Sequence, residues 1–560
     1  MKNYKGFENA NIPIKPLTLL LGKNSSGKTS LIQLILALYQ SHSERTVHPT
    51  QLLHNGPQVN FGPAENLWHS KDLNRKLEFS FTFESLDLAE QITGGFKSYL
   101  QNALFRKLSF YTEYLLSQLE PSANEIEEFS NLQDALTQAT EKFKNQKAYN
   151  SDATLPVNIF EPILEIEEVL SKIRSNLKNK NLGRYLSSRV RGFGVPDREL
   201  KSDLDLTFKL LRNFSAVEIV PNFTLHYEMD VDERNNIYAK TVTLHDANGK
   251  SIISISFERP NNISDKQVVK NIQSDFTDDN LGSFAGTLSL IVGHSYNSLL
   301  RINEARFYHE VEDLKGTRLA EFVTKVLSHS MEECFTPDMT SGVTHVPPLR
   351  AHPRRYYLSE LMSQSFDEGI IFQSLEHSRT KAEINDWLSE FDVSIDVGEL
   401  EQVIKRIMIS PTNNPQLSLE IADVGFGFSQ ILPVISLIVS SRPDSLMVIE
   451  QPEVHLHPDM QAAFGDLLVR LSNLQDGNRQ RHFIVETHSE YLLTEVRAQI
   501  AAGNISADQV SILFFESMND GNNMVKSADI DENGAITWPT QFIERHFRNQ
   551  KILIERQITK

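Results

Sequence analysis

The sequence lacks the features of secreted and membrane-spanning proteins. It contains a single cysteine, Cys334, so neither a disulfide framework nor a thiolate metal cluster can form within the chain. Residues 1–15 contain no continuous apolar stretch of the kind that a secretory signal needs. The longest apolar run, around 431–439, contains Pro433 and is too short to cross a bilayer. We therefore expect a cytoplasmic protein with no membrane partner.

Excess positive charge is also missing. Asp and Glu number 73 against 55 Lys and Arg, and the formal net charge is -18. Proteins that coat nucleic acid need a broadly basic surface, because contacts with phosphates supply most of the affinity. Any contact with nucleic acid must therefore come from a local patch. The 560 residues suffice for two to four domains of about 150 residues each.

A phosphate-binding loop follows the apolar segment Leu17–Leu21, which predicts a buried strand. The pattern G-x-x-x-x-G-K-[ST] is matched in full by Gly22, Lys23, Asn24, Ser25, Ser26, Gly27, Lys28 and Thr29. Glycines let successive backbone N–H groups face the phosphates, Lys28 supplies a positive charge, and the Thr29 hydroxyl is a candidate Mg²⁺ ligand. Residues Ser30 to Gln40 predict a helix, whose N-terminus favours an anion. The segment from Gly22 to Ser30 therefore predicts nucleotide binding.

A second apolar run, Leu446–Ile449, leads into Glu450, Gln451 and Glu453. This is the pattern of a Walker B strand, whose terminal acids face Mg²⁺ and the attacking water, and Glu450 is the candidate Mg²⁺ ligand. An amide cannot accept a proton from water as a carboxylate can. Gln451 therefore predicts slow hydrolysis of the bound nucleotide. Glu453 is the alternative base.

Two further segments are ambiguous when each is taken alone. Asp423–Pro433 is a glycine-rich turn that leads into an apolar helix, with Ser429 in its first turn. By itself this pattern more often indicates a helix cap. Phe483–Glu490 is an apolar strand that ends near His488. A histidine in such a place is more often structural than functional.

Taken in chain order (phosphate loop, glycine-rich turn with Ser429, Walker B strand, strand ending near His488), the four segments resemble the ABC-type ATPases of the RecF/SMC/OLD group, over residues 1 to about 95 and 340–560. The resemblance implies an α/β fold: an ABC-type P-loop head, with a mixed sheet flanked by helices, an antiparallel β lobe and a large helical insertion. It further implies ATP and Mg²⁺ as cofactors and a head-to-head dimer or higher oligomer around ATP. In that dimer Ser429 reaches the γ-phosphate held by the partner and His488 senses this phosphate. Asn3 and Lys5 are expected near the nucleotide.

Residues Pro347–Pro353 and Trp538–Pro539 resemble a subgroup of RecF-like ATPases found in bacterial defence loci. Within it, Septu-type antiphage ATPases act with a separate HNH nuclease and are sometimes encoded beside a retron. The implied function is an ATPase that gates this effector. The alternatives are a RecF-like repair or recombination ATPase that binds DNA directly, and a scaffold that uses ATP only structurally.

About 400 residues separate Thr29 from Ser429. We expect the head at 1–95 and 341–560, a helical insertion at 96–215, and a β meander with a helical segment at 216–340. Apolar residues at a/d spacing over 129–143 and 163–177 favour equally a short coiled-coil hairpin and two ordinary amphipathic helices. Alternation over 77–83 predicts a strand, and alternation over Phe223–Phe257 predicts an antiparallel meander.

The segment Lys172–Lys201 carries nine basic residues and two acidic ones. It fits either a solvated helix face or a site for nucleic acid or an acidic partner. His455 and His457 are more simply a structural turn than a metal pair. Asp529–Gly534 is more simply a hairpin turn than a calcium loop or a nuclease acid pair. We therefore expect no nuclease centre in this chain.

Overall fold

The computed structural model describes residues 1–44, 48–90, 92, 134, 138, 220–259, 268–275, 281, 285–292, 298–299, 317–335, 342–348, 354–358, 366–400, 404–443, 445–473, 475–476, 479–518 and 521–537. The predicted coiled-coil helices, the basic segment Lys172–Lys201, Trp538–Pro539 and most of Pro347–Pro353 lie outside these ranges.

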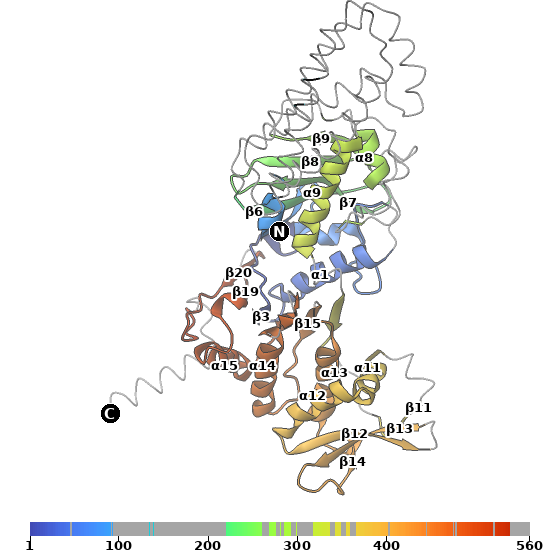
Figure 1. Ribbon diagram of the computed structural model, residues 1–560, viewed down its shortest axis with the longest axis vertical. Helices are drawn as coiled ribbons and strands as arrows, with labels where there is room; N and C mark the ends of the chain where they lie inside the picture. The colour runs from blue at the N-terminus through green and yellow to red at the C-terminus, as the bar shows by residue number, and fades with distance from the viewer. Residues whose placement is uncertain are drawn as a thin grey trace, which may run out of the picture.

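A six-stranded sheet forms the middle of the molecule (Figure 1). Its order is β10 (Val343–Val346), β15 (Leu446–Glu450), β18 (His482–Glu486), β3 (Leu17–Gly22), β19 (Val510–Ser517) and β20 (Asn523–Ser527). All neighbours are parallel except β19 and β20. The continuous apolar runs predicted as strands are the buried centre of this sheet, as parallel strands require. Their carboxyl ends therefore share one edge.

Helices cover both faces of this sheet. Leu20, Val448 and Ile484 belong to the same apolar core as helix α1 (Lys28–Ser43). The alternate positions Leu19 and Met447 belong to a second core, which includes α13 (Phe426–Ser440), α14 (Pro458–Asn473) and α15 (Glu490–Ala501). Successive strand residues point to opposite faces, so each strand supplies both cores.

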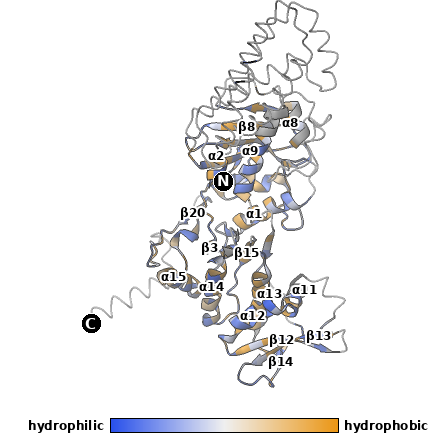
Figure 2. Ribbon diagram, in the orientation of Figure 1, coloured by the Kyte–Doolittle hydropathy of each residue, from blue (hydrophilic) through white to orange (hydrophobic). Residues whose placement is uncertain are grey.

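An eight-stranded antiparallel sheet forms the β lobe. Its order is β2 (Phe7–Asn9), β1 (Lys2–Tyr4), β5 (Leu77–Glu84), β6 (Asn222–Val231), β7 (Ile237–His245), β8 (Ser251–Phe257) and β9 (Val269–Gln273), with β4 (Gln51–Leu52) paired to β7. The meander predicted over Phe223–Phe257 is thus present, with turns at Asn235 and Gly249 in left-handed conformations. Hydrophobic and hydrophilic residues mix along these strands (Figure 2), and α8 (Ala285–Val292) and α9 (Thr317–Phe335) cover one face.

A third, four-stranded sheet lies at the far end of the molecule (Figure 1). It contains β11 (Tyr357–Leu358), β13 (Ile404–Pro411), β12 (Val393–Leu400) and β14 (Leu419–Glu420). Helices α11 (Phe366–Glu376) and α12 (Ser378–Ser389) connect it to α13, and the buried Trp387 lies in their shared core. The sheet therefore supports the start of α13.

The remaining described elements are short: α2 (Leu86–Glu90), β16 (Gln475–Asp476), β17 (Arg479–Gln480), and the 3-10 helices Ala64–Leu67, His69–Lys71, Ile421–Asp423 and Ala507–Gln509. The expected α/β class, a mixed sheet flanked by helices plus an antiparallel β lobe, is confirmed. Within the ranges given above, no helix is long and apolar enough to span a membrane.

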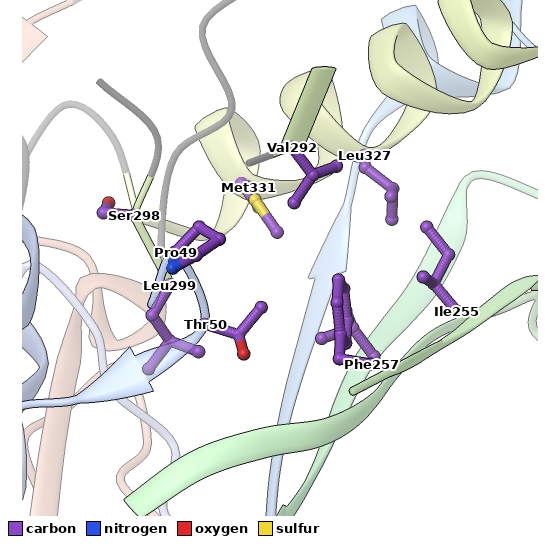
Figure 3. A pocket seen from close by; sticks show the side chains of 10 residues that line it. Pro49, Thr50, Ile255, Phe257, Val292, Ser298, Leu299, Leu327 and Met331 are labelled. Atoms are coloured by element: carbon purple, nitrogen blue, oxygen red, sulfur yellow. The ribbon is translucent and has the colours of Figure 1, made fainter. Parts of the chain in front are cut away.

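A small apolar cavity lies in the β lobe, between the meander and α8 and α9 (Figure 3). Its volume is about 20 Å³, which is the space of one water molecule. Its lining includes Thr50, Phe257, Leu299 and Met331. It is far too small for a nucleotide, so the candidate site must be sought at the edge of the parallel sheet.

Candidate functional site

The phosphate loop turns from the end of β3 into α1. Gly22 and Gly27 have φ angles of 136° and 103°, which only glycine adopts readily. A Cβ on Gly22 would lie 2.2 Å from the carbonyl oxygen of Phe515, and one on Gly27 would lie 2.4 Å from Cζ of Phe7. Both glycine positions of the pattern therefore need glycine in this fold. Helix α1 starts at Lys28, earlier than the Ser30 expected from the sequence.

Lys28 is folded back onto its own loop. Its side chain is 3% exposed, and Nζ donates to the carbonyl oxygens of Gly22 at 2.8 Å and Lys23 at 2.9 Å. Burial lowers the pKa of Lys28, and the nearby carboxylate of Glu486 opposes this shift. Lys23, Asn24, Ser25 and Thr29 are exposed, whereas Ser26 is buried and donates to the Lys23 carbonyl oxygen. Most side chains of the loop are thus accessible to a ligand.

Two acidic residues end neighbouring strands beside this loop. Glu450 of β15 lies opposite Glu486 of β18, and both are buried. Oε1 of Glu450 lies 2.7 Å from Nε2 of His345 on β10. Oε1 of Glu486 lies 3.6 Å from Nζ of Lys28. Burial raises the pKa of Glu486; Lys28 opposes this rise and Glu450 adds to it.

Glu486 and His345 were missed by the sequence reasoning. The only signal for Glu486 was an acid at the end of an apolar strand, and His345 had no signal at all. The position of Glu450 suits its expected role, because it ends the strand next but one to the phosphate loop. Carboxylate, threonine hydroxyl and phosphate oxygens are ligands that Mg²⁺ prefers. Glu450 and Thr29 therefore fit the Mg²⁺ of a bound nucleotide.

The residues after Glu450 contact the segment that contains His488. Gln451 has a left-handed φ of 46°, and its N–H donates to the carbonyl oxygen of Glu486 at 2.7 Å. Oε2 of Glu453 accepts the Thr487 hydroxyl at 2.8 Å, and Oε1 accepts the N–H of His488 at 2.6 Å. Both carboxylate oxygens of Glu453 thus accept hydrogen bonds from this segment. His488 itself is exposed.

The glycine-rich turn does lead into a helix, as expected. Ser429 is the fourth residue of α13 and is only 5% exposed, whereas Gly425, just before the helix, is exposed. A Cβ on Gly427 would lie 3.0 Å from the carbonyl oxygen of His455, so the helix start packs against the turn after β15. The accessible tip of this element is therefore its glycine backbone.

An arginine braces the approach to α13. Arg355 donates to both oxygens of Asp423, from Nη1 at 2.7 Å and from Nη2 at 2.5 Å. Nη1 of Arg355 also lies 3.4 Å from Oε2 of Glu420. The other oxygen of Glu420, Oε1, lies 3.3 Å from Nη1 of Arg406. A bidentate arginine–carboxylate pair fixes orientation as well as distance. The pair holds the turn before α13 against β11 and β13.

The N-terminal hairpin lies between the β lobe and the phosphate loop. Asn3 donates to the carbonyl oxygen of Lys76, and Nζ of Lys5 donates to Oε1 of Gln33. Neither contact involves the phosphate loop. Phe7 meets that loop instead, at Gly27. The hairpin is also paired within the β lobe, because β1 lies beside β5.

The histidine pair His455 and His457 and the acidic segment Asp529–Gly534 both form turns in the structure. Nδ1 of His457 lies 3.3 Å from Oδ2 of Asp459, and the backbone of His455 has a left-handed φ of 66°. No group of three His, Cys, Asp or Glu side chains suited to a metal occurs in the described parts of the chain. Asp531–Gly534 forms the expected hairpin turn, closed by a hydrogen bond from the N–H of Gly534 to the carbonyl oxygen of Asp531.

Comparisons with solved structures give distant similarities. The Smc head domain with an extended coiled coil bound to the C-terminal domain of ScpA, from Pyrococcus furiosus, is 12% identical over 100% of this chain and 98% of that one, with a TM-score of 0.30. The Smc head domain with a coiled coil and joint, from Pyrococcus yayanosii, is 12% identical over 94% and 96%, with a TM-score of 0.27. The SMC head domain from Thermotoga maritima is 9% identical over 55% and 75%, with a TM-score of 0.22.

No curated protein matches this sequence. The family model of the AAA ATPase domain, however, matches residues 1–493, which is most of the chain. That match includes the phosphate loop, Glu450 and His488, the residues that the fold brings to one edge of the parallel sheet. The chain therefore belongs to the AAA ATPase domain family, as an ATPase with a P-loop head.

Proposed function

We propose that this chain is a slow ATP-driven switch. It binds ATP with Mg²⁺ at the phosphate loop, two copies enclose the nucleotides, and the resulting long-lived dimer gates a separate effector nuclease in antiphage defence. The observation that carries the proposal is Gln451, an amide at the end of the strand that supplies the acid Glu450.

Slow turnover follows from the hydrogen bonds around this amide. Gln451 cannot take a proton from water. Both carboxylate oxygens of Glu453, the alternative base, already accept hydrogen bonds from Thr487 and His488, so neither is free of a partner within the head. Without a free carboxylate base the chemical step is slower, because general base catalysis contributes about 10²–10⁴-fold. ATP then persists in the site.

Dimerisation around ATP is supported by what lies at the surface. Gly425 and His488 are exposed, and the motif resemblance assigns their segments to opposite sides of one shared nucleotide. The exposed glycine tip of α13 presents backbone N–H groups at a helix N-terminus, which favour a phosphate. Ser429, the serine expected to reach the γ-phosphate held by the partner copy, lies one turn behind this tip.

The effector and its role in defence are supported by the resemblance of Pro347–Pro353 and Trp538–Pro539 to ATPases of bacterial defence loci. The alternative function is direct DNA binding by a RecF-like repair ATPase. The observation that favours it is the basic segment Lys172–Lys201, with nine basic residues in an acidic chain. Salt-dependent DNA binding that is lost on changing Arg184, Arg189 and Arg191 to Glu would support this alternative.

The direct test isolates the tagged chain from its own host, with and without ATP, and identifies what co-purifies. The switch predicts a nuclease in the ATP-bound sample and an ATP-dependent rise in the mass measured by sedimentation. A Lys28→Ala variant, which lacks the phosphate-binding charge, should show neither. Recovery of the ATPase alone, as a monomer in the presence of ATP, would contradict the proposal. Stimulation of ATP hydrolysis by DNA would favour the alternative function in DNA repair.

A further inference from the structure

Glu486 lies at the centre of the site, outside both the phosphate-loop pattern and the Walker B pattern. It ends β18, the strand between β3, which carries the phosphate loop, and β15, which carries Glu450. Its register partners are Leu20 on one side and Glu450 on the other. Residues paired in adjacent parallel strands project to the same face of a sheet. Two carboxylates are therefore presented together beside the loop.

We propose that Glu486 is the second carboxylate of the magnesium–nucleotide site, beside Glu450. The inference rests on the proposed binding of ATP with Mg²⁺. It adds a residue that neither the phosphate-loop pattern nor the Walker B pattern includes.

The two oxygens of Glu486 have different surroundings. Oε1 lies 3.6 Å from Nζ of Lys28. Oε2 is buried and accepts no hydrogen bond from any part of the chain that the structure describes. The residue as a whole is 5% exposed. A buried carboxylate oxygen without a partner is costly, and such a group in a folded protein calls for a specific explanation. A cation that arrives with the nucleotide supplies one.

The charge balance of the site points to the same cation. Lys28 is the cation that now lies beside Glu486, at 3.6 Å. When a nucleotide binds, its phosphates compete for that charge, and Glu450 and Glu486 then face additional negative charge. A divalent cation between the carboxylates and the phosphates restores the balance. Mg²⁺ typically binds through one or two carboxylates together with phosphates and water, and needs no complete protein cage.

The neighbouring candidates are engaged elsewhere. Oε1 of Glu450 lies against His345, and both oxygens of Glu453 accept hydrogen bonds from Thr487 and His488. Gln451 carries no charge. Glu486 thus has the buried carboxylate oxygen in this cluster for which no hydrogen bond is found within the described chain.

The test is the magnesium dependence of nucleotide binding, which needs no hydrolysis. Affinity for a non-hydrolysable ATP analogue is measured by calorimetry, in Mg²⁺ and in EDTA, for the wild type and for Glu486→Gln. We expect Mg²⁺ to strengthen binding to the wild type strongly. In Glu486→Gln the ratio of the two affinities should fall by about tenfold or more, the order seen when outer partners of a metal are lost. Affinity in EDTA should be unchanged or higher, because one negative charge has gone.

Two further variants make the result specific. Glu228→Gln removes a carboxylate in the β lobe, where it pairs with Lys76 and Lys240, and should keep the wild-type ratio. Glu486→Asp retains the charge on a shorter side chain and should give an intermediate ratio, which serves if the glutamine variant fails to fold. A wild-type ratio in Glu486→Gln, or in Glu486→Asp if only that variant folds, would overturn the inference. Absence of any nucleotide binding by the wild type would instead refute the proposed function.

Discussion

The carboxylate of Glu453 accepts the backbone N–H of His488 at 2.6 Å. This bond joins the turn after β15 to the segment after β18, and the Thr487 hydroxyl adds a second contact to the same carboxylate. The turn that carries Gln451 and the histidine expected to sense the γ-phosphate are therefore one hydrogen-bonded unit.

Removal of this carboxylate should destabilise the head. We expect Glu453→Ala to lower the free energy of unfolding by about 2 kcal/mol, since hydrogen bonds to charged groups contribute about 1.5–3 kcal/mol. Glu453→Gln keeps one acceptor and should lose roughly half as much. Denaturant unfolding without nucleotide measures both. Equal stability of Glu453→Ala and the wild type would mean that the two contacts are replaced by water at no cost.

Gly22 should not tolerate a side chain. Gly22→Ala combines a φ of 136° with a Cβ only 2.2 Å from a backbone oxygen, so we expect loss of nucleotide binding together with lowered stability. Gly249→Ala is the matched control, because its φ is 78° but nothing lies within 4 Å of the added Cβ. That variant should lose about 1–2 kcal/mol and bind nucleotide normally. Similar behaviour of the two variants would refute the steric argument.

Stability should fall in acid partly through His48. Burial lowers the pKa of His48 from 6.5 to about 4, and its Nδ1 accepts the N–H of Thr50, which requires the neutral ring. The unfolded chain therefore binds more protons between these values. The contribution of His48 is fully present above about pH 6.5 and is lost as the pH falls toward 4, by up to about 3 kcal/mol.

His48→Asn keeps an acceptor near Nδ1 and removes the titration. Unfolding free energies of this variant and the wild type, measured between pH 4 and pH 7, should therefore converge as the pH falls. Burial also lowers the pKa values of His54 and His226, so both proteins should keep some slope in this range. Parallel curves for the two proteins would rule out His48 as a source of acid sensitivity.

Arg355 should affect dimerisation more than folding. It is an exposed residue whose main partner, Asp423, precedes the exposed tip of α13. We expect Arg355→Ala to leave the thermal midpoint nearly unchanged and to reduce the dimer fraction formed with ATP, because the tip loses its brace. Arg379→Ala removes an exposed ion pair with Glu383 within α12 and serves as control. A drop in dimer fraction with both variants would indicate a general charge effect.

The sequence predicted the buried strands well and their neighbours poorly. Leu17–Leu21 and Leu446–Ile449 are recognisable because strands buried on both faces are continuously apolar. Whether Glu450 lies beside Glu486 depends on the order of strands that are distant in sequence, and local patterns do not contain that order. The segment Phe483–Glu490 was therefore recognised from the sequence, but the place of its Glu486 in the site was not.

The N-terminal hairpin shows the same limit. Asn3 and Lys5 were expected near the nucleotide because their element resembles one found in the RecF/SMC/OLD group. In the structure β1 and β3 belong to different sheets, and the amide of Asn3 bonds to the carbonyl oxygen of Lys76 in the β lobe. Pairing with β5 decides where β1 lies, and local sequence patterns do not contain that pairing.

Gln451 decides between a slow switch and a fast motor. The most direct measurement is the steady-state ATPase rate of the wild type against Gln451→Glu, at saturating ATP and Mg²⁺, with Lys28→Ala as the blank. We predict a slow wild type and a rate about 10²-fold or more higher in Gln451→Glu, because a carboxylate at this position supplies the missing base. A fast wild type, or no increase in Gln451→Glu, would contradict the account.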